Sequence, residues 1–125
     1  MKIRQISFRA KDFHSNWVYG DLNMLSNIPY IRTDIRQEYA INTNTIGQFI
    51  GLKDKNGTQI YEGDIVKYMG HHYTESIGEI FYDKTCCCFS TKVKNGKGYD
   101  VVDIDSYLEL EVIGNIYDNP ELLKY

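Results

Sequence analysis

The chain has 125 residues, enough for one compact domain with its own hydrophobic core. Its 14 Lys and Arg against 17 Asp and Glu give a formal net charge of −3, which disfavours a protein that coats nucleic acid through a generally cationic surface. A hydrophobic content of 42% excludes a disordered chain, and no apolar run reaches the roughly 20 residues of a membrane span. We also expect no signal peptide, because residues 1–10 lack its apolar stretch.

The residue types favour β-structure. Isoleucine and valine are abundant, tyrosine occurs 11 times, and alanine occurs only at positions 10 and 40. β-Branched and aromatic side chains suit a pleated sheet, and alanine is the best helix former. We therefore predict a mainly β protein.

In chain order, the first expected element is an N-terminal β segment over residues 1–45. Within it, Ile31, Thr33 and Ile35 alternate with charged residues, as in a strand with one wet face. The polar residues 42–45 are interpreted as a loop inside a single domain that spans residues 1–125. The alternative division is 1–45 and 46–125.

Residues 46–125 contain short β-rich runs separated by glycine turns at residues 54–57, 62–64 and 95–98. Asn56-Gly57 is a strong hairpin signal, because both residue types tolerate the positive φ of a type I′ turn. Strands are expected at residues 65–69, 77–82, 86–93, 99–104 and 108–112. Such a meander predicts a small barrel, SH3-like or similar, built from short antiparallel strands and hairpins. Asn119 and Pro120 predict a short C-terminal helical turn.

The three cysteines are adjacent at residues 86–88, which is no disulfide framework and places the chain in a reducing cytoplasm. Together with His72, the thiols of Cys86 and Cys88 form a weak candidate metal site. Zinc requires four ligands, usually in pairs spaced to wrap the ion, and a fourth donor is missing. We interpret the cysteines as small core residues, and expect neither a metal nor another cofactor.

Acidic residues gather near the C-terminus, where Asp103 and Asp105 would share a strand face and could bind a cation or exchange protons. A solvated outer face that discourages edge-to-edge pairing is the simpler interpretation. The N-terminus is basic instead. The opposite ends could pair within a monomer or steer copies into a head-to-tail ring. Alternatively, the basic stretch and nearby aromatics could bind single-stranded nucleic acid through Lys2, Arg4, Arg9, Trp17 and Tyr19.

Three blocks of the sequence, in order, resemble the YopX family of phage and prophage proteins. The first contains Phe8-Arg9-Ala10 and Trp17-Val18-Tyr19-Gly20. The second contains Ile46-Gly47-Gln48-Phe49, Gly51-Leu52-Lys53-Asp54-Lys55-Asn56-Gly57 and Ile60-Tyr61-Glu62-Gly63-Asp64-Ile65-Val66. The third is Val112-Ile113-Gly114-Asn115-Ile116-Tyr117-Asp118-Asn119-Pro120-Glu121-Leu122-Leu123. The resemblance implies a mostly β fold with a barrel-like C-terminal part, self-association and a phage gene. It implies no catalytic or binding site.

The sequence thus predicts a non-catalytic, phage- or prophage-encoded protein of the bacterial cytoplasm. Its expected role is that of a self-assembling interaction protein that forms a homo-oligomer. The alternative is a module that binds single-stranded nucleic acid in phage DNA metabolism or regulation. No membrane partner is expected.

Overall fold

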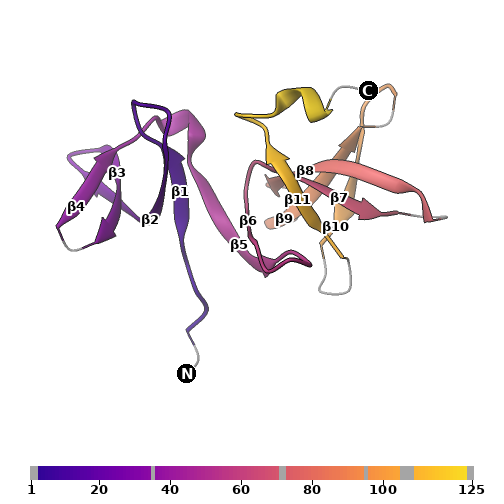
Figure 1. The fold of residues 1–125 in the computed structure, drawn as a ribbon, viewed down its shortest axis with the longest axis horizontal. Helices are drawn as coiled ribbons and strands as arrows, with labels where there is room; N and C mark the ends of the chain where they lie inside the picture. The colour runs from indigo at the N-terminus through magenta and orange to yellow at the C-terminus, as the bar shows by residue number, and fades with distance from the viewer. Residues whose placement is uncertain (1–2, 35, 71–72, 95, 105–108, 124–125) are drawn as a thin grey trace. The chain divides into compact units, whose positions relative to one another are not determined.

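The structure is a computed structural model that describes residues 3–34, 36–70, 73–94, 96–104 and 109–123 (Figure 1). The chain divides into two compact units, Met1–Gly51 and Leu52–Tyr125. Antiparallel strands dominate both units, so the mainly β prediction is confirmed. Within the described ranges, no helix is long and apolar enough to cross a membrane.

The first unit contains most of a six-stranded sheet with the order β4-β3-β2-β1-β5-β6, in which β6 spans Gln59–Tyr61. Its strands are β1 (Phe8–Lys11), β2 (Trp17–Leu25), β3 (Ile28–Asp34), β4 (Gln37–Ala40) and β5 (Gly47–Lys53), which continues into the second unit and precedes β6. Side chains alternate between the two faces of a strand, and one face carries the core. That core consists of Ala10, Val18, Ile31 and Ile41, with Phe8, Leu22, Tyr39 and Ile46 packed against it.

The polar residues 42–45 contain a 3-10 turn, η1 (Thr43–Thr45), that is fastened to β1. The buried Thr45 hydroxyl accepts a hydrogen bond from the Lys11 N–H at 2.8 Å and donates one to the Asn42 carbonyl at 2.7 Å. The Asn42 N–H in turn donates to the Lys11 carbonyl at 2.8 Å. This segment is therefore an ordered corner of the first unit.

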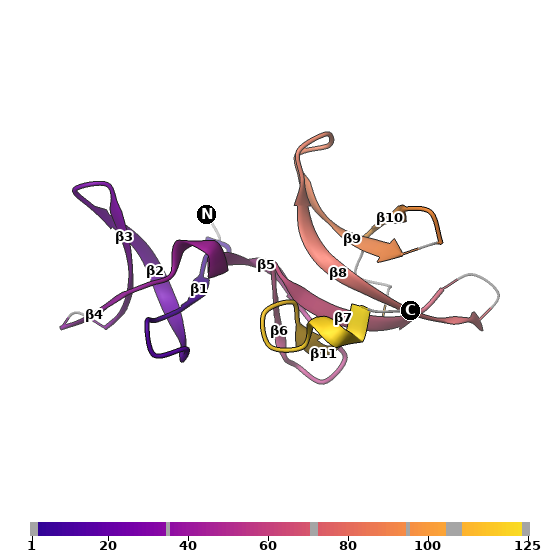
Figure 2. The ribbon, with the colours of Figure 1, turned by 90° about the horizontal axis from the view of Figure 1, so that it is seen from above.

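The second unit contains β6 (Gln59–Tyr61) and a five-stranded sheet with the order β10-β9-β8-β7-β11. The sheet strands are β7 (Asp64–Met69), β8 (Glu75–Asp83), β9 (Cys88–Lys94), β10 (Tyr99–Asp103) and β11 (Glu111–Asn115). Figure 2 shows β8 and β9 as a long curved hairpin. The apolar interior includes Ile60, Ile65, Val66, Ile80 and Leu110.

The predicted barrel is not closed by strand pairing. In the part of the second unit that is described, β10 and β11 are the two ends of the sheet and do not pair with each other. The outer edge of β11 is instead occupied by the turn after β5. The Val112 N–H donates to Asp54 Oδ2 at 3.0 Å, and the Lys55 N–H donates to the Leu110 carbonyl at 3.0 Å. Because these groups are already satisfied, β11 has fewer groups left with which to pair another strand.

Asp54 also shapes the turn to which it belongs. Its buried Oδ1 accepts hydrogen bonds from the N–H groups of Asn56 and Thr58, at 2.9 and 2.8 Å. The hairpin expected at residues 54–57 is present, closed by a hydrogen bond from the Gly57 N–H to the Asp54 carbonyl at 3.0 Å. Of the Asn-Gly pair, only Gly57 has a positive φ, 84°, so the turn is not type I′. The Asp54 carboxylate explains the difference, because it holds the N–H groups of Asn56 and Thr58 in place.

The corner at residues 62–64 is built in a similar way. The buried Asp64 Oδ2 accepts a hydrogen bond from the Tyr61 N–H at 2.8 Å. Gly63, with a φ of 88°, donates its N–H to the Ile80 carbonyl at 2.8 Å and accepts from the Ile116 N–H at 2.9 Å. The corner therefore links β8 to the end of β11.

The chain leaves β11 through a turn organised by two asparagines. Asn115 Oδ1 accepts from the N–H groups of Tyr117 and Asp118, at 3.0 and 2.9 Å, and the Asn119 N–H donates to the Asn115 carbonyl at 2.8 Å. A Cβ at Gly114 would lie 2.6 Å from Asn119 Oδ1, so a larger residue here would displace the Asn119 side chain. The turn leads into η3 (Pro120–Leu123), and the predicted C-terminal helical turn is confirmed.

We predict that Gly57→Val lowers the free energy of unfolding by about 1–2 kcal/mol, because a β-branched side chain disfavours positive φ. A Cβ at this position would have no atom within 4 Å, so the loss would come from backbone conformation alone. Urea denaturation measures it. Gly57→Asn is the matched control and should lose less, since asparagine tolerates this conformation. Equal stability of Gly57→Val and the parent chain would contradict the assigned turn.

Asp54→Asn should lower the free energy of unfolding by about 1–3 kcal/mol at pH 7, since an amide cannot accept all three N–H groups. Burial raises the pKa of the Asp54 carboxyl, but the N–H groups of Val112, Thr58 and Asn56 bring the pKa below its ordinary 3.8. A lowered pKa in the folded state means that the unfolded state binds the proton more readily. The stabilisation is therefore complete above the unfolded pKa and is lost as the pH falls through the folded value.

The difference in stability between the parent chain and Asp54→Asn should accordingly shrink below about pH 4. Urea denaturation at a series of pH values tests this. Asp103→Asn removes the same charge at an exposed position of β10 and should have little effect on the free energy of unfolding. An Asp54→Asn defect that does not depend on pH would show that the carboxylate is not what stabilises the turn.

Candidate functional site

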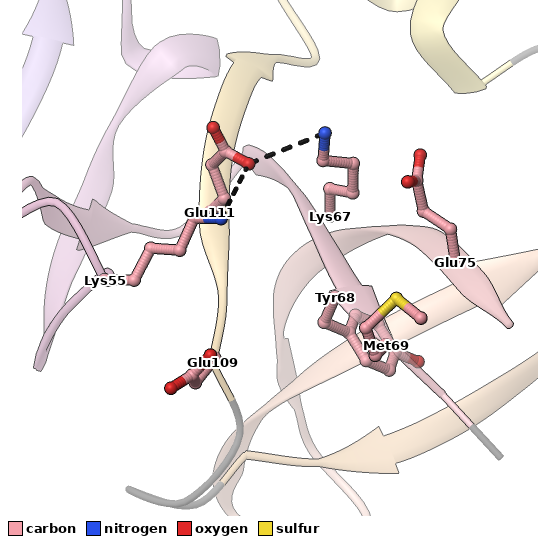
Figure 3. A pocket seen from close by; sticks show the side chains of 7 residues that line it. All are labelled: Lys55, Lys67, Tyr68, Met69, Glu75, Glu109 and Glu111. Atoms are coloured by element: carbon pink, nitrogen blue, oxygen red, sulfur yellow. Dashed lines mark ion pairs between the residues drawn. The ribbon is translucent and has the colours of Figure 1, made fainter. Parts of the chain in front are cut away.

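A hollow of about 440 Å³ in the second unit is lined mostly by charged side chains (Figure 3). Glu111 lies directly opposite Lys67 across β11 and β7, and its Oε2 is 3.5 Å from Lys67 Nζ and 3.4 Å from Lys55 Nζ. Lys55 reaches this position because Asp54 holds its turn against β11. The complete lining is Lys55, Lys67, Tyr68, Met69, Glu75, Glu109 and Glu111.

In this hollow the Glu111 carboxylate of β11 pairs with Lys55, in the turn after β5, and with Lys67, in β7. Partly exposed ion pairs contribute at most about 1 kcal/mol each, so their main effect is on alignment. Glu109 and Glu111 belong to the acidic residues near the C-terminus that were interpreted as a solvated face, and the two lysines were not predicted. No local pattern could have found them, because Lys67 reaches Glu111 only through the register of β7 with β11.

The three cysteines lie at the turn between β8 and β9, with only Cys88 inside a strand. All three are exposed, so their interpretation as core residues was wrong. Asp83 Oδ1 accepts from the Thr85 N–H and hydroxyl at 3.0 and 2.6 Å, which shapes a tight turn with no interior to fill. The sulfurs of Cys86 and Cys88 are 2.8 Å apart.

The weak metal set is not assembled by the described residues. His72 lies outside them, and those that are described contain no group of three or more His, Cys, Asp or Glu arranged to hold a metal ion. The acidic pair is likewise incomplete, because Asp103 is exposed in β10 and Asp105 lies outside the described residues.

The structure brings three of the five nucleic-acid candidates together on one face of β1 and β2. Arg9 is opposite Tyr19, and Lys11 is opposite Trp17. Arg9 is buried with Cζ 4.6 Å from the centroid of the Trp17 ring, and Lys11 Nζ is 5.3 Å from the same centroid. Arg4 is exposed outside the strands, and Lys2 is not described. The result is an aromatic and cationic face, defined as Arg9, Lys11, Trp17 and Tyr19.

The end of the β2–β3 hairpin presents large apolar side chains to solvent. Met24, Leu25 and Ile28 are 58%, 56% and 54% exposed, and Leu25 pairs with Ile28. We name these three residues the apolar tip. The turn between them uses positive φ at Ser26 and Asn27, which fixes the tip as a tight two-residue hairpin. This surface was not predicted, although apolar residues flanking Ser-Asn are a usable hairpin signal.

A second hollow, of about 380 Å³, lies beside β10 and is named the Tyr99 hollow. The Tyr99 ring is exposed, and Lys92 Nζ lies 5.0 Å from its centroid. Leu123 reaches the same hollow from η3. Its lining comprises Glu79, Lys92, Lys94, Gly98, Tyr99 and Leu123.

Comparisons with known proteins identify the family to which the chain belongs. The crystal structure of protein EF1440 from Enterococcus faecalis is similar, with 26% sequence identity, a TM-score of 0.56, and coverage of 96% of this chain and 99% of that one. No curated protein matches the chain. The family model described as YopX protein matches residues 7–124, nearly the whole sequence. The chain therefore belongs to the YopX family, as its three sequence blocks predict.

Proposed function

We propose that this protein is a non-catalytic, phage- or prophage-encoded interaction protein that assembles with further copies of itself in the bacterial cytoplasm. The apolar tip is the observation that carries this proposal. Three large apolar side chains, each more than half exposed, stand together at the end of one hairpin. Clustered apolar exposure on a protein surface is typical of a protein–protein contact, because burial there recovers the hydrophobic free energy.

Charge favours a second copy as the occupant. Residues 1–51 contain six Lys and Arg and four Asp and Glu, for a net charge of +2. Residues 52–125 contain eight Lys and Arg and thirteen Asp and Glu, for a net charge of −5. The first unit of one copy and the second unit of another therefore attract each other. Such a contact joins two different surfaces, so it builds a ring or an open chain.

The Tyr99 hollow is the receiving surface in this proposal. The Tyr99 ring, the Leu123 side chain and the aliphatic stem of Lys92 supply apolar walls, and charged side chains also line the hollow. Such a mixture of apolar and charged side chains is also found in protein interfaces. In the assembly, the apolar tip of one copy is seated in the Tyr99 hollow of the next.

Light scattering at moderate salt should find one discrete oligomer. Leu25→Asp on the tip and Tyr99→Asp in the hollow should each give monomers, because each places a charge in the contact. Mixing the two variants should restore a dimer and nothing larger, since the mixture retains one intact tip and one intact hollow per pair. Phe13→Asp, a change at an exposed apolar residue in the β1–β2 turn, is the matched control and should leave the oligomer intact.

Thermal melts should show that all three variants remain folded. A monomeric parent chain would remove the assembly proposal. An oligomer that survives both Leu25→Asp and Tyr99→Asp would show that other surfaces form it.

The aromatic and cationic face favours a second candidate, a module that binds single-stranded nucleic acid in phage DNA metabolism or regulation. Bases stack on aromatic rings while cations attract the phosphates. Arg9 is buried against Trp17, so Lys11 and Tyr19 are the side chains best placed to contact a nucleic-acid strand.

Binding of a fluorescent oligonucleotide should then weaken steeply with salt, and Tyr19→Ala should reduce affinity about tenfold. Tyr82→Ala, at an exposed tyrosine of β8, is the control. Failure of the parent chain to bind would exclude this candidate.

A further inference from the structure

The thiols at the β8–β9 turn are paired selectively. Cys86 Sγ lies 2.8 Å from Cys88 Sγ, whereas Cys87 Sγ is directed to the Lys84 carbonyl at 3.8 Å. Cys87 has a φ of 55°, a left-handed conformation that turns the chain sharply between its two neighbours. The middle residue therefore brings the outer two sulfurs onto the same side of the turn.

We propose that Cys86 and Cys88 form a redox-active dithiol that closes reversibly to an intramolecular disulfide when the protein meets a low-molecular-weight disulfide. All three thiols of the turn are exposed, so a small oxidant reaches them without unfolding. This site is independent of the assembly proposed above.

The surroundings assign different roles to the two sulfurs. The hydrogen bond to Cys88 raises the pKa of the Cys86 thiol to about 11, and burial and the Asp83 carboxylate act in the same direction. Cys86 thus keeps its proton at neutral pH and is able to donate it toward Cys88 Sγ. Cys88 Sγ also lies 3.6 Å from the Ser90 hydroxyl, a second group able to donate to it. A thiolate is the attacking species in disulfide exchange, so the proton held on Cys86 makes that sulfur the less suited to attack first, and the first attack is assigned to Cys88.

The exchange proceeds in two balanced steps. The Cys88 thiolate attacks one sulfur of the small disulfide, breaks its S–S bond, and releases one small thiolate. Cys86 then gives up its proton and attacks the Cys88 sulfur, which forms the Cys86–Cys88 bond and releases the second small thiolate. The protein loses two electrons and two protons, and the small disulfide becomes two thiols.

The closed loop would enclose a single residue, so closure restricts the unfolded chain little and adds little stability. Short, exposed disulfides are readily reduced, as regulatory disulfides are. The proposed bond should therefore reopen in excess thiol.

Oxidised glutathione is a suitable probe for the full-length chain. The intact mass should fall by two hydrogen atoms, and the number of reactive thiols should fall from three to one. Trypsin releases residues 85–92 as one peptide, in which fragmentation should locate the bond at Cys86 and Cys88. Dithiothreitol should restore the original mass.

Three single variants separate the roles. Cys87→Ser should still lose two hydrogen atoms, whereas Cys86→Ser should retain a glutathione adduct on Cys88. Cys88→Ser should react much more slowly, because the first attacking sulfur is gone. Thermal melts of all three check that the exposed turn tolerates the change. A stable glutathione adduct on Cys86 or Cys88 of the parent chain, a disulfide between two chains, or normal closure in Cys86→Ser would each overturn the proposal.

Discussion

The attachment of β11 to the turn after β5 depends on one buried carboxylate in the second unit. Asp54 accepts three backbone hydrogen bonds, two from its own turn and one from Val112 in β11. A buried carboxylate is tolerated only when its oxygens are satisfied, so the turn and the strand must meet at this residue. Asp64 has a related role at the next corner, where Gly63 bonds to both Ile80 and Ile116. These acids belong to the family's sequence blocks, and the structure gives them a structural purpose.

This constraint extends to the surfaces available for binding. By fixing β11, Asp54 places Glu111 between Lys55 and Lys67. The same strand leads through the asparagine turn into η3, which brings Leu123 to the Tyr99 hollow. The position of the proposed docking surface therefore depends, through β11 and η3, on the turn that contains Asp54. In the first unit, the apolar tip depends only on the β2–β3 hairpin.

The sequence predicted local structure well, because strand alternation and glycine turns are local signals. The strands near residues 65–69 and 77–82 and the hairpin at Gly57 lie where they were expected. The open sheet was not predictable, since the bond from Val112 to Asp54 joins residues 58 positions apart. The position of the cysteines was predicted wrongly because a strand was expected to begin at Cys86. Asp83 instead accepts a hydrogen bond from the Thr85 N–H, which keeps this part of the chain in a turn. The charged hollow depends on strand register, which no single segment encodes.

Amide hydrogen exchange in native conditions tests the central role of Asp54 most directly. In Asp54→Ala, the amides of Val112, Asn56 and Thr58 should lose protection selectively, while amides shared by β8 and β9 keep theirs. That outcome would show that the carboxylate holds β11 against the turn. Unchanged protection at Val112, or an equal loss across the whole sheet, would contradict the account.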